Sequence, residues 1–143
     1  MRSAASYNRL RSTGGQALAE FLVVVPLLLL LLMATVGFGH LIFTKMVVVQ
    51  AANRAARLGS VLFGDSTVST SEARKQTREA ALSTLSTALN GDDREVTVTE
   101  VGDDLKVTVR YRSTVFVPLL RPWLGSEFSV EHESVYRVER DTP

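Results

Sequence analysis

The sequence contains no cysteine among its 143 residues. This absence excludes a disulfide scaffold, a thiolate metal site and a cysteine nucleophile. The sequence also has little excess of either charge, with 16 Lys and Arg against 15 Asp and Glu. The net charge therefore gives no argument for a nucleic-acid partner. The length allows one small domain rather than two domains joined by a linker.

Motifs of catalysis and phosphate binding are also missing: the chain has no G-x-S-x-G, H-E-x-x-H or P-loop pattern. Strand alternation directs His132 away from its neighbours Glu131 and Glu133, which argues against a metal site there. The pairs Asp92–Asp93 and Asp103–Asp104 are more typical of solvated turns than of calcium ligands. We therefore expect a non-enzymatic protein without a metal ion or other cofactor.

The apolar residues are concentrated in one run, from Phe21 to Phe43, which carries no Asp, Glu, Lys or Arg. A helix of these 23 residues rises about 34 Å, enough to cross a hydrocarbon core of about 30 Å. The run is longer than the apolar part of a signal peptide, and no small-residue cleavage pattern follows it. We predict a retained membrane-spanning helix over about residues 21–43.

A basic leader precedes this run, because residues 1–15 contain three arginines and no acidic residue. The positive-inside tendency places the leader in the cytoplasm and exports the C-terminal part. Lys45, Arg54 and Arg57 on the far side reduce this asymmetry. The predicted organisation is a leader at 1–15, an N-terminal helix at 16–63 and an exported domain at 64–143.

The junction between leader and anchor combines Gly15 with Glu20, a carboxylate directly before the apolar run. In one interpretation, Glu20 lies at headgroup level in the first turn, where the helix dipole favours it. In the other, the glycine and carboxylate act together, because the arrangement resembles the G-x-x-x-x-E-[YF] signal of class III prepilins. That resemblance implies cleavage between Gly15 and Gln16 by a prepilin peptidase, with Glu20 and Phe21 left near the new N-terminus.

Cleavage at this position has a physical consequence for assembly. It creates a cationic amine on Gln16, and the Glu20 carboxylate can pair with such an amine on a neighbouring subunit. An unpaired charge is costly inside a bilayer, so this pairing favours docking among other helices.

The resemblance continues along the helix, and residues 14–60 are similar to the N-terminal region of TadE-like proteins. The matching features are a G-x-x-x-x-E-F start, a proline in the apolar helix, an F-G pair and an Ala/Arg-rich stretch: Gly15, Glu20, Phe21, Pro26, Phe38, Gly39 and Ala51 to Arg57. The tail from Ser134 to Glu139 resembles the C-terminal strand of that family.

This resemblance implies a minor pilin or pseudopilin of a bacterial Tad/Flp pilus assembly system. Its implied partners are a prepilin peptidase, other pilins or pseudopilins, and inner-membrane assembly components. The implied location is a single pass through the cytoplasmic membrane with the C-terminal domain outside it. The alternative is a signal-anchored envelope binding module that is neither processed nor assembled.

Within the apolar helix, Pro26 removes one backbone donor and favours a bend, with or without a functional role. Gly37 and Gly39 either allow another helix to approach closely or merely lower local rigidity. We interpret His40 as an interfacial polar residue rather than a proton relay or ligand.

Small residues recur beyond the membrane, with Ala51, Ala55 and Gly59 at a spacing of four and Ala52 beside them. Such a face suits close packing of backbones. Its partner is either the protein's own domain, which we favour, or another subunit.

The remainder predicts a small α+β domain. Ser69 to Glu72 has capping-box spacing, so a helix should begin near Thr70. Alternating residues predict strands over 96–99, 105–112 and 127–140, and Gly102 in a short polar link indicates a hairpin between the first two. The expected architecture is a long N-terminal helix and a second helix packed on an antiparallel sheet of about three strands, a plan that resembles the pilins.

The connection before the last strand, residues 115–124, is unusually apolar and includes Phe116 and Trp123. These two aromatics either fold back over the sheet edge or form an exposed patch for a partner or the membrane interface.

Overall fold

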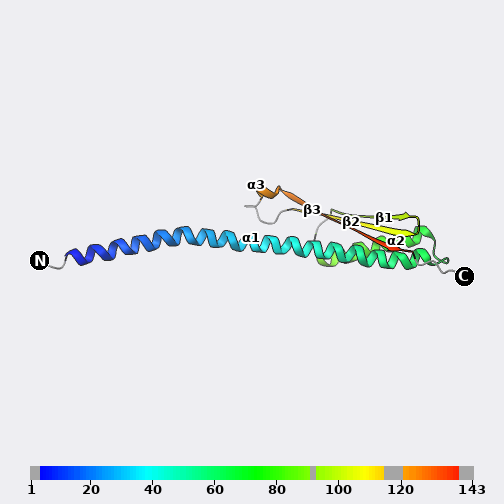
Figure 1. The fold of residues 1–143 in the computed structure, drawn as a ribbon, viewed down its shortest axis with the longest axis horizontal. Coiled ribbons are helices and arrows are strands. Elements are labelled where there is room, and N and C mark those ends of the chain that lie inside the picture. The colour runs from blue at the N-terminus through cyan, green and yellow to red at the C-terminus, as the bar shows by residue number, and fades with distance from the viewer. Residues whose placement is uncertain (1–3, 91–92, 115–120, 139–143) are drawn as a thin grey trace. The chain divides into compact units, whose positions relative to one another are not determined.

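The computed structural model describes residues 4–90, 93–114 and 121–138, with side chains from Gly15 onward except those of Trp123 and Leu124. The elements in chain order are α1 Ala4–Gly64, α2 Thr70–Ala88, β1 Arg94–Val101, β2 Asp104–Thr114, α3 Arg121–Leu124 and β3 Glu127–Arg137 (Figure 1). A long apolar helix, a second helix and a three-stranded antiparallel sheet confirm the predicted α+β class.

The chain divides into two compact units, residues 1–38 and 39–143. In the first unit α1 begins at Ala4, so its backbone is already helical within most of the predicted leader, and it continues without interruption through Pro26. Its apolar side chains are exposed over most of the unit. Among the described residues, this is the one helix long and apolar enough to span a membrane.

In the second unit, α2 begins at Thr70 as predicted, and Ser69 caps it. The Ser69 hydroxyl accepts a hydrogen bond from the Glu72 backbone amide at 3.3 Å. This bond satisfies one of the amides that a helix start leaves without a partner. The buried face of α2 follows the helical repeat and consists of Ala73, Thr77, Ala81 and Leu85.

The three strands form one antiparallel sheet in the order β1-β2-β3. The predicted hairpin between β1 and β2 is present: Val101 pairs with Asp104 across a two-residue turn, in which Gly102 has a φ of 66°. Only glycine adopts this positive φ without strain, as the first central position of a type II′ turn requires. The observed β1 is longer than the predicted strand at 96–99, and β3 ends at Arg137.

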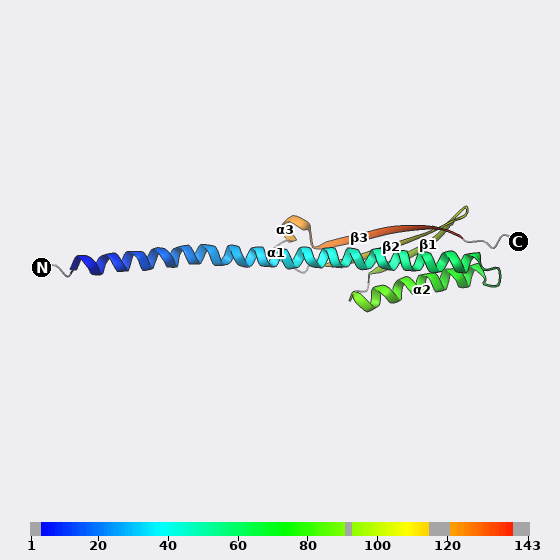
Figure 2. The same cartoon turned by 60° about the horizontal axis from the view of Figure 1, so that its bottom comes forward.

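One face of the sheet carries the core and is covered by the two helices, which run side by side (Figure 2). The core combines valines and alanines of α1, one alanine and one leucine of α2 with the leucine after it, and alternating residues of the strands: Val47, Val48, Ala51, Ala52, Ala55, Ala56, Ala81, Leu85, Leu89, Val96, Leu105, Val107, Val109, Tyr111 and Val138. Because α1 contributes mostly alanine here, its backbone lies close to the sheet.

Two contacts join α1 directly to β3. The Ser134 hydroxyl donates a hydrogen bond to Oδ1 of Asn53 at 2.8 Å. Nearer the start of the strand, the rings of His40 and Phe128 meet edge to face with centroids 6.5 Å apart. On β3, Phe128, Val130, His132 and Ser134 are less exposed than the residues between them, whereas Tyr136, which continues the same alternation, is 39% exposed.

Candidate functional site

The candidate processing site lies on an open helix surface. The Gln16 side-chain amide donates a hydrogen bond to Oε1 of Glu20 at 3.2 Å, and both side chains are exposed. A side chain at Gly15 would meet no atom within 4 Å, and Phe21 is 65% exposed. Over the side chains that the structure describes, no cation pairs with the Glu20 carboxylate.

The peptide bond between Gly15 and Gln16 lies inside α1 rather than at its end. A helical bond must open locally before a peptidase can bind it in an extended form. Gly14 and Gly15 stand together here, and each glycine weakens a helix by about 1 kcal/mol relative to alanine. The sequence thus places a weakened helical turn at the predicted cleavage position.

After this cluster, the part of α1 that lies in the first unit presents apolar side chains on every side, including Leu22 at 63% and Leu31 at 66% exposure. A helix that is apolar all round is suited to a bilayer or to a bundle of similar helices. Of the two glycines predicted to assist packing, Gly37 is half-buried, and Gly39 is exposed with no atom within 4 Å of an added side chain.

The small-residue face of α1 lies against the protein's own domain. Ala51 and Ala55 are fully buried. A side chain at Gly59 would overlap Cδ2 of Leu105 and would lie 2.9 Å from Oγ1 of Thr77. In this structure, therefore, the face serves the contact between helix and sheet.

Residues 15–57 match the family model described as TadE-like protein. This segment is similar to TadE-like proteins. The match begins at Gly15, includes Gln16, Glu20, Phe21 and the buried alanines of α1, and ends before α2. Neither a curated protein nor a solved structure is similar enough to this chain to count as a match.

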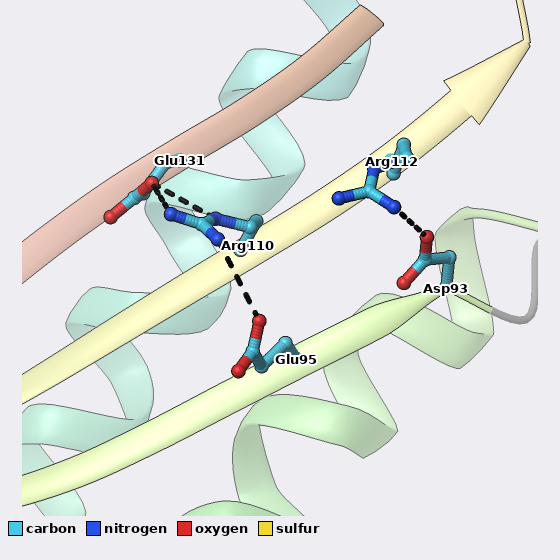
Figure 3. Close-up of polar contacts among 5 residues, drawn as sticks. All are labelled: Asp93, Glu95, Arg110, Arg112 and Glu131. Atoms are coloured by element: carbon cyan, nitrogen blue, oxygen red, sulfur yellow. Dashed lines mark hydrogen bonds and ion pairs between the residues drawn. The ribbon is translucent and has the colours of Figure 1, made fainter. Parts of the chain in front are cut away.

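Outside the TadE-like segment, the exposed face of the sheet carries a ladder of ion pairs (Figure 3). The guanidinium of Arg110 lies 2.7 Å from Oε2 of Glu131 on one side and 3.9 Å from Oε2 of Glu95 on the other. Arg112 pairs with Asp93 at 3.1 Å, and Lys106 pairs with Glu133 at 2.7 Å. Each pair joins β2 to a neighbouring segment, although exposed pairs contribute little stability individually.

The charged side chains of these pairs therefore already have partners. The hydrogen bonds and the charge of Glu131 raise the pKa of Arg110 above its ordinary value. Glu131 and Glu133 pair with cations of β2, whereas His132 lies opposite Val109. In the part of the chain that the structure describes, no three His, Asp or Glu side chains lie close enough together to hold a metal ion.

Of the two aromatics in the apolar connection, Phe116 lies outside the described residues, and Trp123 belongs to α3. Sequence reasoning missed the contact between His40 and Phe128 and the bond between Asn53 and Ser134. No local signal marks these contacts, because each joins residues more than 80 positions apart in the chain.

Proposed function

We propose that this protein is a non-enzymatic, minor pilin-like subunit of a bacterial Tad/Flp pilus assembly system. The observation that carries the proposal is the exposed Gly15–Gln16–Glu20 cluster at the start of an apolar helix, within the TadE-like match. Its partners are a prepilin peptidase, other pilins or pseudopilins, and inner-membrane assembly components. The helix crosses the cytoplasmic membrane once, with the leader inside and the sheet domain outside.

The first step is cleavage between Gly15 and Gln16. The open surface around Gly15 leaves room for a peptidase to approach the backbone, and the adjacent glycines lower the cost of opening the helix there. Cleavage removes the arginines of the leader and leaves an amine on Gln16.

The second step is docking through Glu20. Because the Glu20 carboxylate has no cation partner among the described side chains, it is available to the amine of a neighbouring subunit's processed N-terminus. Within a bilayer, this pairing removes the cost of an isolated charge. The apolar surface of α1 then packs among similar helices, and the sheet domain is displayed outside the membrane.

Intact mass of the membrane-extracted protein, from cells with and without an active prepilin peptidase, tests the first step. We expect a mature chain that begins at Gln16 only when the peptidase is active, and Gly15→Leu should block its formation. A full-length chain in peptidase-positive cells would contradict the proposal and favour the unprocessed envelope binding module.

Glu20→Gln tests the second step, because the substitution keeps the size and removes the charge. We expect normal cleavage, but at least a tenfold loss of the protein from assembled complexes, since an unpaired intramembrane charge costs about 2 kcal/mol or more. Glu72→Gln is the control on α2: Gln76 donates to Oε1 of Glu72 at 3.1 Å, also four residues apart, although here the glutamate precedes the glutamine in the helix. Assembly that tolerates Glu20→Gln as well as it tolerates Glu72→Gln would exclude the docking role.

A further inference from the structure

The two contacts between α1 and β3 show that these elements run side by side in the same direction. His40 and Asn53, the two contact residues on α1, are 13 positions apart, a rise of about 20 Å in a helix. Phe128 and Ser134, their partners on β3, are six positions apart, also about 20 Å in a strand. Because the two distances agree, each position along the axis of α1 can be matched to the residue of β3 that lies beside it.

The outer edge of the hydrocarbon core can be located on α1 from its charges. Between Glu20 and Lys45 there are 24 residues without Asp, Glu, Lys or Arg, and a core of about 30 Å requires about 20 helical residues. If Glu20 marks the inner boundary, the outer boundary falls at His40. If Lys45 is instead the first residue outside the hydrocarbon core, the last residue within the core is Thr44. Both placements put the boundary between residues 40 and 44.

This level is where the sheet begins. Phe128 contacts His40, and its strand neighbour Glu127 pairs with Thr114 at the end of β2. On α1, Ile42 and Phe43 are 62% and 50% exposed at the same level. Apolar side chains of α1 and β3 therefore lie together at this end of the domain.

The residues just before β3 have the composition of a membrane interface. Helix α3 contains an exposed Arg121 and the single Trp123. It ends three positions before β3, with the Gly125 amide bonded to the Arg121 carbonyl at 2.9 Å and a φ of 80° at Gly125. Trp and Arg are favoured at the level of lipid headgroups, where an apolar body and a polar or charged end can both be satisfied.

We propose that this end of the domain, formed by α3, Phe128 and the exposed Ile42 and Phe43, rests in the outer headgroup layer of the bilayer. The partner is the lipid surface itself. The proposal depends on the membrane anchoring in the proposed function. Its consequence is that the hairpin at Gly102, at the other end of β2, stands about 34 Å from the headgroups, ten strand residues away.

The single tryptophan allows a direct test with the full chain in phosphatidylcholine vesicles. Lipids brominated near the glycerol end of the acyl chain quench a nearby indole, and lipids brominated at the chain end report deeper burial. We expect shallow bromines to quench Trp123 roughly twofold, more strongly than deep ones, with reduced access of acrylamide compared with detergent solution. The matched control is Val101→Trp combined with Trp123→Phe, which moves the probe to the exposed hairpin end. This variant should not be quenched by either lipid.

Vesicle flotation of the same samples distinguishes a chain without a membrane anchor from an anchored chain whose α3 does not reach the headgroups. A chain that does not float with the vesicles has no membrane anchor, and the proposed function then fails. A chain that floats, but whose Trp123 is no better quenched by shallow bromines than the hairpin tryptophan, keeps its anchor and overturns the inference alone. Stronger quenching by deep bromines also overturns it, because α3 would then lie within the hydrocarbon rather than at its edge.

Discussion

Gly59 lies where α1, α2 and β2 meet, and replacing it with alanine should destabilise the sheet domain. The added methyl group would overlap Cδ2 of Leu105 and would lie 2.9 Å and 3.0 Å from Oγ1 and Cγ2 of Thr77. Both neighbours are fully buried, so neither can shift into solvent to make room. Thr77 is also held by a hydrogen bond of 2.7 Å from its hydroxyl to the Ala73 carbonyl.

The size of the effect follows from two opposing terms. Alanine in place of glycine favours the helix by about 1 kcal/mol. Overpacking of a buried site costs about 1–3 kcal/mol, and we expect the upper end because neither Leu105 nor Thr77 can move into solvent. The net prediction is a loss of about 2 kcal/mol in the free energy of unfolding. Gly39→Ala is the control, because no atom lies within 4 Å of its new methyl group and only the helical gain remains.

Hydrogen exchange of the β2 amides around Val107 and Val109 measures this loss in detergent micelles, where α1 can remain helical while the sheet opens. A loss of about 2 kcal/mol makes exchange through global opening of the domain roughly 30-fold faster. The double variant Gly59→Ala with Leu105→Val should lose less than the sum of the two single variants, because valine lacks the overlapping carbon. Unchanged or slower exchange in Gly59→Ala, or strict additivity in the double variant, would refute the close packing of α1 on β2.

Two further predictions concern the link between α1 and α2. Ser69→Ala removes the cap of α2 and should cost about 1 kcal/mol in thermal or denaturant unfolding, and a change below a few tenths would contradict the capping role. Asp65 has a lowered pKa because its carboxylate accepts hydrogen bonds from the hydroxyl and the backbone amide of Thr67, at 2.7 Å and 2.8 Å. These bonds support the folded state above pH 3.8, the ordinary pKa, and their contribution is lost as the pH falls through the lowered value. Thr67→Val should move the Asp65 pKa toward 3.8 in an NMR titration, and an unchanged pKa would exclude the hydroxyl as its cause.

Local chemistry alone was sufficient for several elements. Ser69 marked the start of α2 because its hydroxyl satisfies an amide that the helix cannot. Gly102 marked the hairpin, and the two-residue turn seen in the structure then fixes the pairing of Glu95 with Arg110. The register of β3 could not be derived in this way, because the long apolar connection before it imposes no spacing between the strands.

In the candidate site, too, the local motif could be predicted from the sequence, whereas the contacts between distant residues could not. The Gly15–Gln16–Glu20 cluster is local, so a sequence motif was enough to locate it, and the TadE-like match covers it. The partner of the small-residue face was open from sequence, because alanines at a spacing of four pack equally well on a sheet or on a second helix. The structure brings Leu105 and Thr77 against Gly59 and so uses that face within the protein.

The sequence by itself determined the long apolar helix, the Gly15 and Glu20 motif before it, and the order of helices and strands, since each depends on composition or on residues a few positions apart. Only the tertiary structure decided how far the sheet extends along α1. The contacts of His40 with Phe128 and of Asn53 with Ser134 join distant parts of the chain. Buried apolar surface and the hydrogen bond between Asn53 and Ser134 hold β3 against α1. No local sequence pattern encodes the position along α1 at which β3 packs.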